Sequence, residues 1–220
     1  MIVAIDGPAG SGKSTVAREV ARRLGFTYLD SGAMYRAVTL CALDEGADLD
    51  DGPALGALAR GLDIELRRRD DDNVHVIMDG RDVSEPVREP RVTGASSAVA
   101  AHPEVRAALL AKQRALMASG NYVVEGRDIG TVVAPDAPVK AFLTADPEER
   151  ARRRATELER RGLSIDRHEV RAAIEQRDTL DSTRSAAPLR RADDAELIDT
   201  TGLDAGQVAD RIVALVERAR

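Results

Sequence analysis

Near the N-terminus, the eight residues 7–14, Gly-Pro-Ala-Gly-Ser-Gly-Lys-Ser, join an apolar run to a stretch with helical periodicity. The apolar run, residues 2–6, is short and rich in branched side chains, which is typical of a buried parallel strand. The residues after the loop carry apolar side chains at near-helical spacing up to Gly25, which is well placed to end a helix. A strand, a glycine-rich loop and a helix in this order predict an α/β protein with a parallel sheet.

The loop matches a phosphate-binding pattern in which backbone N–H groups surround phosphate oxygens. Glycines suit such a loop because a side chain would block the close approach of the anion. Lys13, one of three lysines in the chain, supplies a positive charge for the β- and γ-phosphates, and the Ser14 hydroxyl is the expected Mg²⁺ ligand. The sequence therefore predicts binding of a nucleoside triphosphate. The residues expected to surround it are Gly7, Pro8, Ala9, Gly10, Ser11, Gly12, Lys13, Ser14 and Thr15.

Composition narrows the class of protein further. With 220 residues, of which 43% are hydrophobic, the chain is long enough to bury one sizeable core. Its net charge of −6 disfavours a general nucleic-acid binder, and no run of about 18 uncharged apolar residues suggests a membrane span. Cys41 is the single cysteine, which excludes an intramolecular disulfide, and the histidines lack metal-ligand spacing. We expect a cytoplasmic monomer that binds small molecules and neither nucleic acid nor membrane.

Five short apolar segments have the length and the flanking turn residues of buried parallel strands. Helical patterns separate them, which is the order of a doubly wound α/β sheet. The five predicted strands are residues 2–6, 26–30, 122–125, 139–144 and 196–199.

The second and third strands are about ninety residues apart, far more than a βα connection needs. This insertion contains helical patterns at residues 31–43 and 105–117 and three short antiparallel strand patterns at residues 63–66, 75–78 and 82–84. Asp79-Gly80 is a strong hairpin signal between the last two of these strands. We interpret residues 31–118 as a substrate-binding lobe, with its small sheet near residues 63–85, inside a single domain of residues 1–220.

Two further helical patterns follow the fourth strand, and residues 146–166 are the candidate lid region. Asp146-Pro147-Glu148-Glu149 has the cap, the first-turn proline and the acidic residues of a helix start, and the helix should end near Gly162. A second helix begins near residues 164–166 and continues past Arg177. Two such arms fit a lid that closes over phosphates, and they fit equally well a charged hairpin in solvent.

Polar clusters follow the second and third strands, where parallel sheets bind their ligands. Residues 30–36, Asp-Ser-Gly-Ala-Met-Tyr-Arg, follow the second strand, and residues 125–130, Glu-Gly-Arg-Asp-Ile-Gly, end the third. Each cluster places an arginine beside a carboxylate, and either cluster taken by itself fits a structural ion pair. Together, Arg36 and Arg127 fit bidentate binding of a phosphate, so the pair of clusters favours a phosphorylated acceptor.

Over nearly its whole length, the sequence resembles the bacterial cytidylate kinases, a family of nucleoside monophosphate kinases. The resemblance rests on residues 7–14, 30–36 and 126–133, and on Arg177-Asp178 through Asp181 and Arg184 to Ala187-Pro188-Leu189. It implies a P-loop kinase core with a five-stranded parallel sheet flanked by helices, a substrate-binding insertion with a small antiparallel sheet, and a helical lid. It also implies ATP and Mg²⁺ as cofactors and CMP and dCMP as substrates.

The resemblance implies a role for individual residues as well. Asp128, Arg106 and Ser97 would read the cytosine edge, where a carboxylate facing the amine and an arginine facing the acceptors reject uracil. The residues expected to line the acceptor site are Asp30, Ser31, Tyr35, Arg36, Ser97, Arg106, Arg127, Asp128, Arg177, Asp181 and Arg184. Among them Arg177 and Asp181 would reach the sugar, and Arg36, Arg127 and Arg184 the acceptor phosphate.

The expected reaction is phosphoryl transfer from ATP to CMP or dCMP. Transfer needs charge neutralisation by Lys13, Mg²⁺ and the lid, for which the candidate arginines are Arg150, Arg153 and Arg154. Arg36 and Arg127 would align the acceptor. Asp30 would act on Mg²⁺ through water, or it is a structural helix cap. Two other functions stay open, a kinase for another small acceptor such as shikimate and a nucleotide-gated regulatory protein.

Overall fold

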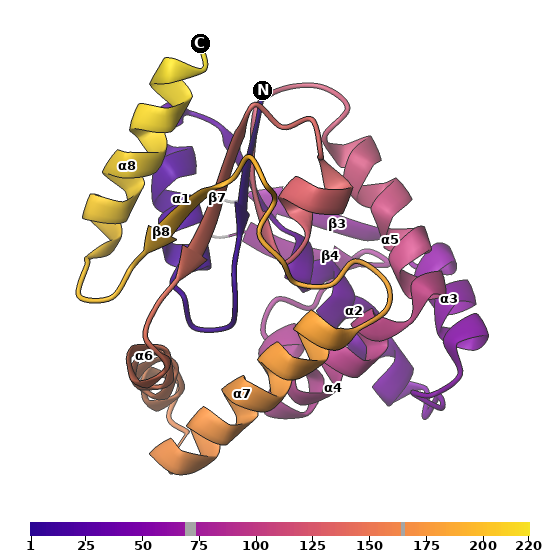
Figure 1. Ribbon diagram of the computed structural model, residues 1–220. Coiled ribbons are helices and arrows are strands. Elements are labelled where there is room, and N and C mark those ends of the chain that lie inside the picture. The colour runs from indigo at the N-terminus through magenta and orange to yellow at the C-terminus, as the bar shows by residue number, and fades with distance from the viewer. Residues whose placement is uncertain (69–73, 164–165) are drawn as a thin grey trace. The chain divides into compact units, whose positions relative to one another are not determined.

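The computed structural model describes residues 1–68, 74–163 and 166–220, and the described residues form two compact units (Figure 1). The first, here called the core unit, contains Met1–Tyr28, Gly120–Thr183 and Ala187–Arg220. The second, the insertion unit, contains Leu29–Ser119 and Arg184–Ala186.

The core unit is built on a parallel sheet with the strand order β2-β6-β1-β7-β8. The register places Ile2 of β1 opposite Tyr122 of β6, and Val3 opposite Val139 of β7. The strands are buried at the centre of the sheet, since Val3, Val123 and Leu143 are fully buried. The predicted five-stranded parallel sheet is therefore confirmed. Its strands are β1 (Ile2–Asp6), β2 (Thr27–Asp30), β6 (Tyr122–Gly126), β7 (Val139–Thr144) and β8 (Glu196–Asp199).

Two helices of the core unit, α1 (Lys13–Leu24) and α8 (Ala205–Arg218), pack against each other (Figure 1). Their apolar stripes meet the protein interior, where Val16, Val20 and Ile212 are at most 2% exposed. Gly25, predicted to end α1, has a φ of +66° and donates its N–H to the carbonyl of Ala21. This left-handed residue after the last turn is a common way for a helix to end.

The predicted lid region, residues 146–166, contains α6 (Pro147–Arg160), and α7 (Arg167–Thr183) follows it. The Asp146 carboxylate accepts the N–H of Glu148 at 2.8 Å and caps α6, as its sequence predicts. Residues 164–165, where the second helix was expected to begin, lie outside the described residues. The two helices pack on each other through a small apolar cluster against which Ala9 of the loop is packed. The buried members of the cluster are Ala151, Leu158, Val170 and Ile174.

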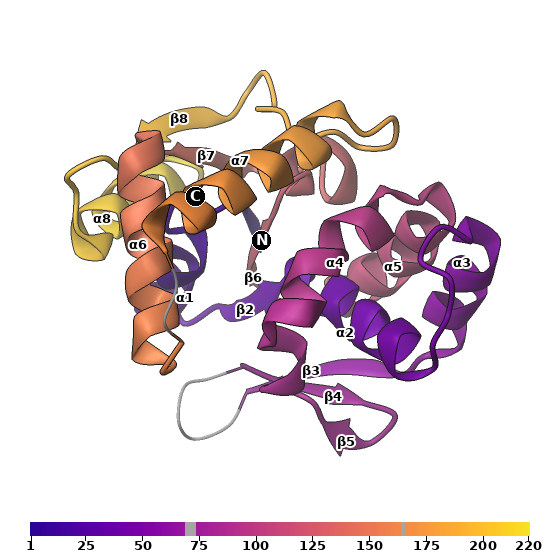
Figure 2. The same cartoon turned by 90° about the horizontal axis from the view of Figure 1, so that it is seen from below.

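The insertion unit combines helices with a small antiparallel sheet of order β3-β4-β5 (Figure 2). Asp79 and Gly80 have φ angles of +48° and +77°, the two left-handed residues of a tight hairpin turn, which confirms the predicted turn between β4 and β5. Helices α3 and α5 lie side by side in Figure 2. The elements are α2 (Ser31–Asp44), α3 (Gly52–Gly61), β3 (Ile64–Arg68), β4 (Val74–Met78), β5 (Arg81–Asp82), the 3-10 helix η1 (Pro86–Arg88), α4 (Pro90–Ala101) and α5 (Pro103–Leu116).

Candidate active site

The glycines of the loop between β1 and α1 stand where no other residue fits. Gly7 has a φ of +148°, and a Cβ there would lie 2.1 Å from the carbonyl oxygen of Leu143. Gly10 has a φ of +75°, and its Cβ would lie 2.8 Å from the carbonyl oxygen of Arg150. Both the backbone angle and the close approach of a neighbouring chain segment require glycine, so the loop's sequence is dictated by its packing as well as by its chemistry.

Lys13 is the first residue of α1, and only 6% of it is exposed. Its Nζ donates to the carbonyl oxygen of Pro8 at 2.6 Å, which folds the side chain back across the loop. Burial, reinforced by the nearby charge of Arg127, lowers the pKa of Lys13 to about 7. A polyanion bound in the loop would favour the charged ammonium and raise this pKa again.

Ser14 lies beside the buried carboxylate of Glu125, which the sequence analysis placed in a polar cluster but gave no role of its own. Its Oγ donates to Oε2 of Glu125 at 2.9 Å, and the Tyr28 hydroxyl donates to the other oxygen of the same carboxylate. Glu125 lies near the carboxyl end of β6, the strand that pairs with β1. A hydroxyl and a carboxylate held together are hard oxygen donors, which is the set that Mg²⁺ prefers. The residues present therefore fit the predicted metal.

An ion pair joins two residues that were predicted for different parts of the acceptor. Nε of Arg127 donates to Oδ2 of Asp181 at 2.9 Å. The Asp181 side chain is 4% exposed and that of Arg127 is 18% exposed, so the pair is poorly hydrated. Arg177, expected to reach the sugar as Asp181 does, lies one turn earlier on α7. The core unit thus brings the predicted phosphate arginine and the predicted sugar carboxylate into direct contact.

Asp6, to which the sequence analysis gave no role either, fixes the segment that follows Asp128. Its buried carboxylate accepts the N–H groups of Ile129 at 2.9 Å and Gly130 at 2.8 Å. These two residues begin η2 (Ile129–Val133), a single π-helical turn of a kind often found at functional sites. Burial raises the pKa of Asp6 to about 6. Asp128 itself is 4% exposed, so the predicted base-reading carboxylate is held close to the protein interior.

The three predicted lid arginines differ in their surroundings. Arg150 is buried, and its Nη1 donates to the carbonyl oxygen of Ala9 at 3.1 Å. Arg153 donates to the carbonyl oxygen of Thr200 at 2.7 Å and to Glu149 at 2.8 Å. Arg154 pairs with Glu157 on the exposed side of α6. Within the part of the chain that the structure describes, Arg150 is therefore the one predicted lid arginine with a direct hydrogen bond to the phosphate-binding loop.

In the insertion unit, Asp30 has the structural contacts that its sequence position left open. One carboxylate oxygen accepts the N–H of Ala33 at 3.0 Å and caps α2, while the other accepts from Nη2 of Arg36 at 2.8 Å. A Cβ on the intervening Gly32 would lie 3.1 Å from both side chains, so the turn is tightly packed. The predicted cap is present, and it orders the arginine expected to bind the acceptor phosphate.

Four of the residues expected to line the acceptor site, Ser31, Tyr35, Ser97 and Arg106, lie on the helices α2, α4 and α5 of the insertion unit. The Arg106 guanidinium stacks over the Tyr35 ring at 5.4 Å from its centroid, and its Nη1 donates to the carbonyl oxygen of Ala100 at 3.2 Å. Ser31 on α2 and Ser97 on α4 are both buried. Arg184 follows α7 in sequence and belongs to this unit. Arg106 and Tyr35 are thus in contact, as a shared role at one site requires.

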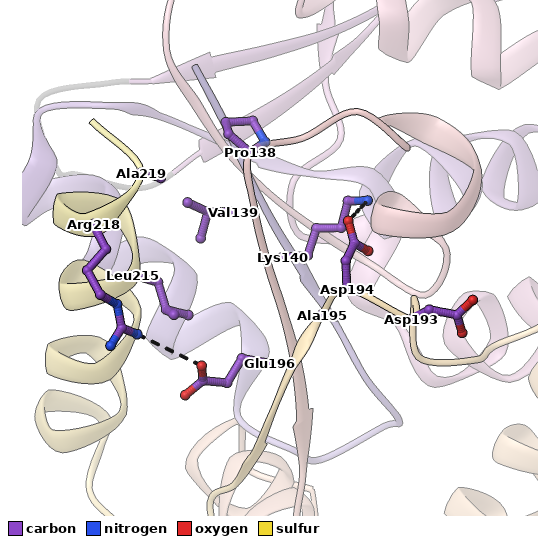
Figure 3. Close-up of a pocket in the computed structure, with 10 residues that line it drawn as sticks. All are labelled: Pro138, Val139, Lys140, Asp193, Asp194, Ala195, Glu196, Leu215, Arg218 and Ala219. Atoms are coloured by element: carbon purple, nitrogen blue, oxygen red, sulfur yellow. Dashed lines mark hydrogen bonds and ion pairs between the residues drawn. The ribbon is translucent and has the colours of Figure 1, made fainter.

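A cavity of the core unit, of about 320 Å³, lies among β7, β8 and α8 (Figure 3). Its two cations have carboxylate partners, since Lys140 pairs with Asp194 at 2.7 Å and Arg218 with Glu196 at 3.9 Å. Its lining residues come from elements other than the phosphate-binding loop. We assign it no ligand. None of the described helices combines the length and the apolar character needed to cross a bilayer.

The parallel sheet, the glycine-rich loop and the buried lysine at the start of α1 define the class of the protein, a P-loop nucleotide-binding fold. The family model described as cytidylate kinase matches residues 3–218, and the chain belongs to this family. A cytidylate kinase of Pelotomaculum thermopropionicum is 51% identical over 218 residues, which cover 99% of this chain and 96% of that protein.

The relatives also include longer proteins. A bifunctional pantoate ligase/cytidylate kinase of a Synechococcus strain, WH7803, is 54% identical over 212 residues, which cover 96% of this chain but 43% of that protein. The chain therefore spans less than half the length of such relatives. Among solved structures, an uncharacterized protein from Eubacterium ventriosum superposes with a TM-score of 0.54 at 14% identity, covering 99% of this chain and 98% of that one. This last similarity concerns the fold alone.

Proposed function

We propose that the protein transfers the γ-phosphoryl group of ATP to CMP and dCMP and releases ADP with CDP or dCDP. The observation that carries the proposal is the match of almost the whole chain to the cytidylate kinase family. The site residues support it, since Lys13 and the Ser14–Glu125 pair suit a triphosphate with its metal. A regulatory protein would need no arginines for a second phosphate, the role that we propose for Arg36 and Arg127, which follow two strands of the sheet.

The metal would be held by the Ser14 hydroxyl and the Glu125 carboxylate. When bound, Mg²⁺ neutralises charge on the β- and γ-phosphates. Lys13 adds its own charge from inside the loop. The predicted water-mediated role of Asp30 stays a prediction, since both of its carboxylate oxygens accept hydrogen bonds from the protein.

The acceptor phosphate needs no general base, because its oxygens are already largely ionised near pH 7. The task of the protein is to align two polyanions and to neutralise charge as the phosphoryl group moves. In this proposal Arg36, Arg127 and Arg184 bind the acceptor phosphate. Arg150 and Arg153 stabilise the moving group, with Arg154 as the third lid candidate.

The acceptor nucleoside is recognised through its base and sugar. Asp128, Arg106 and Ser97 read the cytosine edge in this proposal, while Arg177 and Asp181 bind the sugar. Asp128 is an acceptor for the exocyclic amine that cytosine has and uracil lacks. Residues 31–118 are the proposed monophosphate-binding region and residues 146–166 the proposed lid. A monomer in the cytoplasm, without nucleic-acid partners, stays a prediction of the sequence.

The test is an assay of ADP release with ATP and Mg²⁺ and one acceptor at a time. We expect turnover with CMP and dCMP and much weaker turnover with UMP, AMP and shikimate. Preference for another acceptor would replace the substrate but keep the class. ADP release that is independent of any acceptor, or no release at all, would contradict the proposal.

A further inference from the structure

Asp178 lies on α7 next to Arg177 and one turn before Asp181, yet no role for it follows from the proposed reaction. Its carboxylate has partners in two other segments. Oδ1 accepts the backbone N–H of Ala9, in the phosphate-binding loop, at 3.0 Å. Oδ2 accepts from Nη1 of Arg150, on α6. The same guanidinium nitrogen donates to the carbonyl oxygen of Ala9 at 3.1 Å, so the Asp178–Arg150 pair binds both polar backbone atoms of Ala9.

Burial makes this arrangement stronger than an ordinary surface ion pair. The Arg150 side chain is 10% exposed and that of Asp178 is 19% exposed. Charge-assisted hydrogen bonds with little access to water are among the stronger ones in proteins. The next loop residue is packed against the same place, since a Cβ on Gly10 would meet the backbone and Cβ of Arg150. The loop therefore rests on α6 and α7 at Ala9 and Gly10.

Other carboxylates of α7 serve different purposes. Glu175 pairs with Arg171 on the exposed surface of the helix. Asp181, three residues after Asp178 and hence on a neighbouring position of the same helix face, accepts from Arg127. One helix thus contacts the phosphate-binding loop through one aspartate and the predicted acceptor-phosphate arginine through another.

We propose that Asp178 is a positioning residue for ATP, whose carboxylate fixes the Ala9 peptide and the Arg150 guanidinium in the geometry that binds the triphosphate. Asp178 itself touches no substrate in this account and acts through Ala9 and Arg150. The inference rests on the proposed function of the loop as an ATP site.

Steady-state kinetics of Asp178→Asn and Asp178→Ala test the inference. Asparagine keeps an oxygen for the Ala9 N–H but loses the charge that pairs with Arg150, whereas alanine loses both. Removing a hydrogen bond to a charged group shifts binding by roughly tenfold or more, so we expect the KM for ATP to rise about tenfold in Asp178→Asn and further in Asp178→Ala. The KM for CMP should change less than about twofold, because the acceptor does not bind to the loop.

Glu175→Gln is the matched control, since it removes one negative charge from the same helix at an exposed position. It should leave both KM values as in the wild type, and thermal unfolding should show whether each variant is folded. An ATP KM that is unchanged or lower in both Asp178 variants would overturn the inference. So would equal increases in both KM values together with a lower Tm, which would mark a purely structural role.

The role of Asp178 and the proposed function can be tested separately. If the wild type is active on CMP, the KM values decide the role of Asp178. If the wild type transfers nothing to CMP, the proposed function fails. Calorimetric titration with ATP and Mg²⁺ then tests the role of Asp178 without any acceptor. We expect ATP to bind more weakly to Asp178→Asn than to Glu175→Gln. Equal binding to the two variants would contradict the inference.

Discussion

Burial sets the ionisation of Lys13, and this gives ATP binding a measurable proton balance. With its pKa near 7 in the free protein, Lys13 is largely uncharged at pH 8 and becomes charged beside the phosphates. We expect an uptake approaching one proton per ATP at pH 8 and much less at pH 6, where the lysine is already charged. Calorimetry in buffers of different ionisation enthalpy measures this uptake. Lys13→Arg, which stays charged, should bind without it, and equal uptake at both pH values in the wild type would refute the assignment.

The carboxylate of Asp128 should control the selectivity of the protein for CMP over UMP. Replacing it with alanine removes the proposed acceptor for the cytosine amine, and one such hydrogen bond contributes about 1–3 kcal/mol to discrimination. The ratio of kcat/KM for CMP to that for UMP should fall about tenfold or more. Asp136→Ala, at an exposed carboxylate eight residues later, should keep the wild-type ratio. Unchanged selectivity in Asp128→Ala would remove this residue from base recognition.

Local residues of the site were predictable from the sequence, and their partners were not. The loop is a contiguous signature, so Gly7, Lys13 and Ser14 could be found without knowing the fold. Glu125 lies 111 positions from Ser14, and nothing near either residue reveals their hydrogen bond. Such pairs arise from strand order, here from β6 lying beside β1. An acid at the end of a strand next to the loop strand is the one signal that could have identified Glu125.

At the scale of the elements, Asp6 links β1 to the π-helical turn η2. Because burial raises its pKa above the unfolded value of 3.8 to about 6, the folded state binds a proton more tightly than the unfolded state between these values. The contribution of Asp6 to stability is therefore fully present below pH 4 and is lost as the pH rises through 6.

Denaturant unfolding of the wild type and Asp6→Asn at several pH values tests this linkage. The stability of the wild type relative to Asp6→Asn should fall by up to about 3 kcal/mol between pH 4 and pH 7, at about 1.4 kcal/mol for each pKa unit. Comparing the two proteins cancels the other titrating groups. A difference that stays constant over this range would show that folding does not raise the pKa of Asp6.

The elements also show where periodicity fails as a guide. The strands of the parallel sheet are short apolar runs, Gly25 marks the end of α1 and Asp146 the start of α6, so the positions of these elements could be predicted. Helices α3 and α4 were not predicted. Helix α4 (Pro90–Ala101) is rich in small residues. Its buried Ser96 and Ser97 interrupt the apolar stripe by which an amphipathic helix is recognised in a sequence. Helix α4 packs against α2 and α5, and these tertiary contacts are not visible in its local sequence pattern.

At the scale of the whole molecule, the loop and the acceptor residues are proposed to serve one reaction, phosphoryl transfer between two nucleotides. The most direct measurement is the fate of the γ-phosphoryl group, followed with ATP labelled at that phosphate, Mg²⁺ and CMP. We expect the label to appear in the β-phosphate of CDP in step with ADP release. Label that accumulates instead as inorganic phosphate, at a rate independent of CMP, would contradict the proposed reaction.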